Sequence, residues 1–153
     1  MTALTDPMHR HHKHCDSLFA EAEAAAAKGE WQAAAQNFNA FHQQLETHFR
    51  TEEEVLFPAF EATTGMTGGP TQMMRFEHAQ MRDLVARMDD SMQARDAAGF
   101  AGAAETLLIL MQQHNMKEEN ILYPMCDRSL ASQSGPLGAR LNERLDETCL
   151  TTP

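Results

Sequence analysis

The stretch that decides the fold reads His48-Phe49-Arg50-Thr51-Glu52-Glu53-Glu54-Val55-Leu56-Phe57-Pro58, which follows the pattern H-x-x-x-E-E-x-[VI]-L-[FY]-P. The pattern recurs 66 residues later as His114-Asn115-Met116-Lys117-Glu118-Glu119-Asn120-Ile121-Leu122-Tyr123-Pro124. The same offset relates His12 to His78. Self-similarity at one fixed offset is the mark of a repeated structural unit. We therefore interpret the chain as two copies of a helical hairpin, each contributing two histidines and one glutamate.

Four segments carry apolar residues at helical spacing, and turn residues separate them. Asp6 and Pro7 predict the start of the first helix, and Gly29 predicts its end. The second segment runs from about Glu30 to the region of Pro58, where we expect a kink. The third and fourth are expected over 70–94 and from about 99 to 127, and no segment has strand-like alternation. The sequence thus predicts an all-α, up-down-up-down four-helix bundle built from two repeated helical hairpins.

The repeats end before the end of the chain. We expect residues 1–128 to form the bundle and residues 129–153 to form a C-terminal tail. Within the tail, Leu137, Leu141 and Leu145 mark a short amphipathic helix. The sequence leaves open whether this helix packs on the bundle or on a partner.

The composition limits the classes of function. The 153 residues contain 12 Lys and Arg against 22 Asp and Glu, a formal net charge of −10 that argues against a nucleic-acid partner. The chain has neither an apolar run of about twenty residues nor an apolar signal core, so we expect a cytoplasmic protein without membrane contact. Three cysteines without C-x-x-C spacing favour free thiols in a reducing compartment. Monomer and homodimer are both compatible with the sequence.

The repeated motif predicts a metal site. Residues four apart lie on the same face of a helix, so His48 projects with Glu52 and His114 with Glu118. Each pair lies on an apolar stripe that is expected to face the core, flanked by Leu45 and Val55 in the first copy and by Met111 and Ile121 in the second. A single pair of this kind is more often exposed to solvent, but duplication on two core-facing stripes favours burial. Buried carboxylates need a counter-charge, and neither stripe carries a lysine or arginine at this level. Two imidazoles per ion and two shared carboxylates are typical of a dinuclear centre. The methionines of the third helix are read as core filling.

The order of these motifs resembles the hemerythrin-like, HHE cation-binding family over residues 8–128. The resemblance implies a four-helix bundle with two oxo- or hydroxo-bridged iron ions, although zinc or manganese could occupy the same ligands. It assigns the metal ligands His12, His48, Glu52, His78, His114 and Glu118, with the two glutamates as bridges. It leaves Glu53, Glu77 and Glu119 as neighbours of the ligands. His14 is an alternative to His12, because histidines crowd the start of the chain.

The chain departs from the oxygen-carrying members of that family at one position. Those members have a further histidine one turn after the third-helix ligand, where this chain has Arg82; the matching residue of the first repeat is Asp16. With this departure, the chain resembles the family branch linked to nitric oxide and iron–sulfur cluster repair more than it resembles the oxygen carriers. If a pseudo-twofold axis relates the repeats, Asp16 and Arg82 should approach each other over the metal pair. They would then form a salt-bridged gate, or Asp16 would supply an extra ligand; the alternative is that both are ordinary charges on the helix surface.

Three functions follow as hypotheses. The first is a non-haem di-iron protein that binds a small diatomic ligand (oxygen or nitric oxide), or an anion, for sensing, scavenging or delivery. The second is a di-iron enzyme that reduces nitric oxide or peroxide or repairs iron–sulfur clusters. The third is an iron store or a structural metal site.

Overall fold

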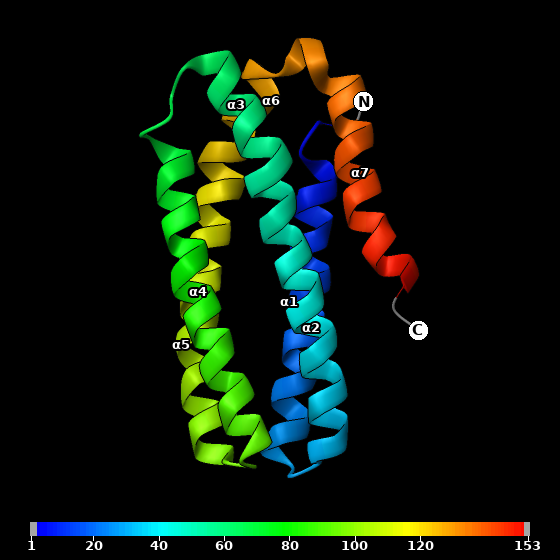
Figure 1. Cartoon of the computed structure of the whole chain (residues 1–153), viewed down its shortest axis with the longest axis vertical. Helices are drawn as coiled ribbons and strands as arrows, with labels where there is room; N and C mark the ends of the chain where they lie inside the picture. Colours follow the sequence, from blue (N-terminus) through cyan, green and yellow to red (C-terminus); the bar gives the residue numbers. More distant parts are fainter. Residues whose placement is uncertain (1–2, 152–153) are drawn as a thin grey trace.

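The computed structural model describes residues 3–151, and describes side chains for residues 3–146. The bundle is formed by α1 (Asp6–Ala27), α2 (Trp31–Thr51), α4 (Pro70–Gln93) and α5 (Ala97–Lys117), which run alternately up and down (Figure 1). Helix α1 packs on α2 and α4 on α5, and the two hairpins meet through α1 with α5 and α2 with α4. No strand occurs within residues 3–151. The predicted all-α bundle is therefore confirmed.

Short turns join the helices at the lower end of the bundle. Gly29 has φ 73°, a left-handed conformation that lets the chain reverse between α1 and α2. Asp96 caps α5, because its Oδ1 accepts a hydrogen bond of 3.0 Å from the backbone N–H of Gly99. Within residues 3–151, none of the helices is both long enough and apolar enough to span a membrane.

Two π-helical turns interrupt the long helices at the repeated motif. Helix α2 passes through Glu52–Leu56 into α3 (Phe57–Thr64), and α5 passes through Glu118–Leu122 into α6 (Tyr123–Ser129). The wide turns are closed by bonds from the N–H of Phe57 to the carbonyl of Glu52 and from Tyr123 to Glu118. Pro58 and Pro124 follow directly; a proline lacks the N–H of an α-helical bond, and its ring crowds the carbonyl four residues earlier. A widened turn relieves that clash, so the expected kink at Pro58 is a π turn just before it.

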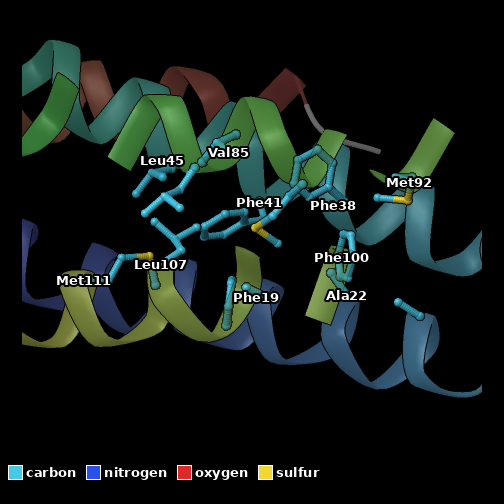
Figure 2. Packing of buried hydrophobic residues seen from close by; sticks show 14 of the residues in the cluster. Phe19, Ala22, Phe38, Phe41, Leu45, Val85, Met92, Phe100, Leu107 and Met111 are labelled. Carbon is cyan, nitrogen blue, oxygen red and sulfur yellow. The ribbon is translucent and has the colours of Figure 1, made fainter. Parts of the chain in front are cut away.

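The apolar core has two parts with the motif residues between them. The lower part is rich in aromatic side chains from α1, α2 and α5, among them Phe19, Phe38, Phe41 and Phe100 (Figure 2). The upper part gathers residues of the α3 and α6 region with leucines of α7. Along α2 the lower cluster ends at Phe49 and the upper one resumes at Val55. The polar residues in between are thus enclosed by apolar packing on both sides.

Helix α7 (Ser134–Thr151) runs along the outside of the first hairpin, against α1 and α2 (Figure 1). It buries Leu137, Leu141 and Leu145. Because α7 covers only the first hairpin, equivalent residues of the two hairpins differ in burial. Val55 is 2% exposed, whereas the matching Ile121 of the second hairpin is 58% exposed. The sequence predicted that both residues face the core, which is wrong for Ile121 because no equivalent helix within the described residues covers it.

Candidate metal centre

The structure brings the six predicted ligand residues together in the middle of the bundle. Each of the four long helices contributes a histidine, and the two π turns each begin with a glutamate. All six side chains are at most 5% exposed: His12, His48, Glu52, His78, His114 and Glu118. The remaining candidate, His14, is exposed on the outer face of α1 and takes no part in the cluster. These positions result from the i, i+4 spacing on core-facing stripes.

The ligand atoms form two groups that share a residue. One group comprises Glu52, His78, His114 and Glu118, and the other comprises His12, His48 and Glu118; within each, the atoms lie within 4.8 Å of one another. Each carboxylate faces both groups. Glu118 places Oε1 3.1 Å from His12 Nε2 and Oε2 3.3 Å from His114 Nε2. Glu52 places Oε1 3.0 Å from His78 Nε2 and Oε2 3.7 Å from His48 Nε2. Carboxylates in this position can bridge two ions.

Four buried atoms of the larger group lack a hydrogen-bond partner among the described residues: Glu52 Oε1, His78 Nε2, His114 Nε2 and Glu118 Oε2. Their mutual contacts are short but do not have hydrogen-bond alignment. Buried polar atoms are rarely left unpaired, because each costs about 1–3 kcal/mol. Four such atoms close together could serve as the donor set of a cation. The residues present therefore fit a metal ion of the kind that binds imidazole and carboxylate.

In the smaller group, the phenol of Tyr123 takes part in the contacts. Its hydroxyl lies 2.7 Å from Glu52 Oε2 and 3.1 Å from Glu118 Oε1, to either of which it can donate, and 3.3 Å from Nε2 of both His12 and His48. The side chain is fully buried. In the sequence this residue stands out only as the aromatic position of the motif, and its contact with the site was not predicted. The difference between Phe57 and Tyr123 in the two copies was the available signal.

The Nδ1 atom of each of the four histidines also has a hydrogen-bonding partner outside the two ligand groups. Glu53 contacts Nδ1 of His78 at 2.7 Å, Glu77 that of His114 at 2.8 Å and Glu119 that of His12 at 2.7 Å. A partner on Nδ1 fixes the ring and leaves Nε2 for the centre. The three glutamates that the sequence left as neighbours thus orient the histidines.

The fourth histidine has a neutral partner. His11 is buried, and its Nε2 lies 2.8 Å from Oε1 of Gln44 while its Nδ1 lies 2.9 Å from Nδ1 of His48. If Nε2 of His11 donates to Gln44, its Nδ1 accepts a bond from His48, again leaving Nε2 of His48 for the centre. His11 occupies the position that matches Glu77 in the second repeat. The two halves of the site therefore differ in the charge around them.

The electrostatics of the metal-free site follow these contacts. Burial alone lowers the pKa of His12, but hydrogen bonds to Glu118 and Glu119 outweigh it and raise that pKa to about 10. The pKa of His78 likewise rises to about 9 against burial, because the negative charges of Glu52 and Glu53 lie 3.0 and 2.7 Å from its ring nitrogens. For His48 burial prevails over the attraction of Glu52 and lowers the pKa to about 3. Some histidines of the site are therefore protonated and positively charged at neutral pH when no cation is bound.

Arg82 does not form the expected gate with Asp16. Its guanidinium binds Glu46 at 2.9 and 3.1 Å and Glu53 at 2.9 and 3.0 Å, and it lies over the ring of Phe49. These partners are on the same side of the bundle as Arg82 and together satisfy its planar donors. The predicted Asp16–Arg82 salt bridge is therefore wrong, and Arg82 instead supports Glu53, the partner of His78.

Asp16 faces a small cavity beside the smaller ligand group. The cavity is lined by His12, His48 and Asp16 together with mainly apolar side chains, Cys15, Leu45, Phe49, Met81 and Met111, and with Asn115. Its volume of about 10 Å³ is close to the space that one water molecule needs. The arrangement leaves room next to the histidines for about one water-sized molecule.

Comparison with known proteins agrees with this geometry. The family model described as the hemerythrin HHE cation binding domain matches residues 3–126. The chain is 30% identical over 100 residues to the iron-sulfur cluster repair protein YtfE of Edwardsiella ictaluri (strain 93-146), a match that covers 59% of this chain and 45% of that protein. The chain thus spans less than half the length of that relative. No solved structure gives a significant match. With the family model matching most of its length, the chain belongs to the hemerythrin HHE cation-binding domain family.

Proposed function

We propose that this protein holds two iron ions and binds a small diatomic ligand, oxygen or nitric oxide, beside them. His12, His48 and Glu118 hold one ion; His78 and His114 hold the other together with Glu52 and Glu118. When bound, the ions supply a redox-active centre with affinity for diatomic gases. The side chains keep the imidazole rings oriented and keep bulk water away.

The single observation that carries the choice of ligand is the cavity beside His12 and His48. It has space for about one water-sized molecule and its walls are mostly apolar, properties that favour a very small neutral ligand such as a diatomic gas over an organic substrate. A store would need space for many ions, and a purely structural site would need no cavity at its ligands. The two-histidine donor set per ion also supplies fewer donors than six-coordinate iron accepts.

A second candidate function is the repair of iron–sulfur clusters, and the similarity to the repair protein of Edwardsiella ictaluri favours it. Repair requires that iron can leave the site. The pair His48–His11 favours release from the smaller group, because His48 has a neutral partner where the other histidines have carboxylates. Recovery of activity by an oxidant-damaged [4Fe–4S] enzyme, with iron-loaded protein compared with the same amount of free iron, tests this candidate.

The proposed function is tested by iron content and visible absorption of aerobically purified protein, before and after reduction and exposure to oxygen and to nitric oxide. We expect about two irons per chain and a spectrum that changes with each gas. A site filled with zinc, or an iron spectrum that neither gas alters, would contradict gas binding and favour a structural or storage role.

Matched histidine variants test the ligand assignment. His12→Ala should reduce iron to about one per chain, whereas His14→Ala, two residues away on the exposed face, should retain about two. The opposite result, with iron lost only from His14→Ala, would show that the first-helix ligand is wrongly assigned.

A further inference from the structure

Tyr123 contacts all three residues of the smaller ligand group, His12, His48 and Glu118, and also contacts Glu52 of the larger group. Its oxygen lies 2.7 and 3.1 Å from one oxygen of Glu52 and one of Glu118, and 3.3 Å from each of two histidine Nε2 atoms. These are the atoms that face the His12–His48 side of the centre. One buried hydroxyl thus lies within hydrogen-bond distance of four potential donor atoms, three from the smaller ligand group and one from Glu52.

The two halves of the site differ at this point. In the His78–His114 half, the four converging atoms have no hydrogen-bond partner among the described residues. The ring of Phe57 stacks on His78 with centroids 5.9 Å apart and planes at 20°, and Tyr123 stacks on His12 at 5.6 Å and 18°. The rings therefore occupy equivalent places in the two hairpins. Only the hydroxyl distinguishes them, and it points at the metal group.

The π turn explains how a residue five positions after Glu118 reaches the same site. In an α-helix, residue i+5 points about 140° away from residue i. The turn Glu118–Leu122 is instead closed by the bond from the N–H of Tyr123 to the carbonyl of Glu118, which returns residue 123 toward the face of residue 118. The local backbone thus brings the phenol beside the bridging carboxylate.

We propose that Tyr123 is a seventh protein ligand, whose phenolate oxygen binds the iron of the His12–His48 group. Neighbouring donors on one first-row metal ion, with bonds of about 2.0–2.2 Å, lie roughly 3 Å apart, which is the spacing that the hydroxyl already has from the four donor atoms. Phenolate oxygen is an established ligand of ferric iron in proteins. As the iron–oxygen bond forms, the O–H bond breaks and its proton is released to solvent, with no change in electron count.

The proposal rests on the proposed di-iron function and makes the two ions unequal. An anionic phenolate stabilises the higher charge of ferric iron, so the ion of the His12–His48 group should be harder to reduce than the ion of the His78–His114 group. Phe57 provides no such donor to the second ion.

The chain contains one tyrosine, so any tyrosinate signal from the iron-loaded protein must come from Tyr123. The test is visible absorption and resonance Raman spectroscopy of the full-length, aerobically iron-loaded protein, grown with ordinary or ring-deuterated tyrosine. We expect a broad phenolate-to-iron charge-transfer band and ring vibrations that shift on deuteration. An iron-loaded protein without deuterium-sensitive, resonance-enhanced vibrations would overturn the proposal.

Variants sharpen the test. Tyr123→Phe should keep at least one iron per chain and lose the charge-transfer band, whereas Phe57→Leu, at the equivalent position of the other hairpin, should keep the band. Loss of the band from both variants, or from neither, would overturn the assignment.

Failure of the wild-type chain to take up iron would refute the proposed function itself, whereas uptake of two irons without a phenolate signal would refute only the role of Tyr123. The labelled wild-type protein carries the test even if Tyr123→Phe does not fold.

Discussion

Individual side chains set both the charge and the space at the centre. In the metal-free protein, His12 and His78 have pKa values of about 10 and about 9, because contacts with neighbouring carboxylates outweigh the effect of burial. Ligation requires a neutral imidazole nitrogen, so metal uptake near neutral pH must release protons. The histidine protons and the metal ions thus serve as alternative counter-charges for Glu52 and Glu118.

The stability of the metal-free protein should consequently fall as pH rises. A histidine with a folded pKa above its unfolded value of 6.5 stabilises the fold fully below 6.5, and this contribution disappears as pH rises toward the folded pKa. Between about pH 7 and about pH 8.5, His12 and His78 should each lower the unfolding free energy by about 1.4 kcal/mol per pH unit. Urea unfolding of chelator-treated protein at both values measures this. A free energy that does not change with pH would contradict the hydrogen-bonded charge pairs.

The cavity also makes a prediction at the scale of one residue. Leu45 lines it and is 7% exposed, whereas Leu84 is equally buried but does not line it. Leu45→Phe should slow nitric oxide binding several-fold with iron content unchanged, and Leu84→Phe, with a similar cost of overpacking, should leave the rate near that of the wild type. Stopped-flow absorption gives both rates. Equal rates in all three proteins would show that the ligand does not use this cavity.

At the scale of elements, the repeated motif predicted most of the fold. Helix limits followed from Asp6, Pro7 and Gly29, and the i, i+4 pairs predicted which faces would meet. The sequence predicted a kink where the structure has a π turn, because proline indicates that an α-helical bond is lost but not how the backbone accommodates the loss. The partners of Arg82 were not predictable, since Glu46 and Glu53 are 36 and 29 residues away on another helix.

The π turns should matter for metal binding and less for folding. Pro124→Ala restores an N–H and removes the ring that crowds the carbonyl of Asn120, which allows the turn to tighten toward an α-helix. We expect the helix content to be retained but iron to be removed more readily by a chelator, because Glu118 and Tyr123 lose their shared orientation. Pro136→Ala, also in the first turn of a helix but in α7, is the control. Equal rates of iron loss would show that the π turn does not position the ligands.

At the scale of the whole molecule, α7 makes the repeat unsymmetrical. Two near-identical motifs predicted equal burial for Val55 and Ile121, and only the packing of α7 on the first hairpin separates them. The internal offset could not reveal this, because α7 lies outside the repeat. The amphipathic leucines predicted a helix there without indicating the surface that it covers.

The contribution of α7 to stability can be measured with one leucine. Leu141 is fully buried between α7 and the bundle, so Leu141→Ala should lower the unfolding free energy by about 2–5 kcal/mol. Glu143→Ala, on the exposed face of the same helix, should change it by less than about 0.5 kcal/mol. Chemical denaturation compares the two variants with the wild type. A small effect of Leu141→Ala would mean that α7 adds little to the stability of the bundle.

The most direct test of the central claim is anomalous diffraction at the iron edge from crystals of the iron-loaded, full-length chain. The account predicts two iron peaks in the middle of the bundle. One lies among His12, His48, Glu118 and Tyr123, and the other lies among Glu52, His78, His114 and Glu118. A single peak, or iron only at surface sites, would contradict the di-iron centre.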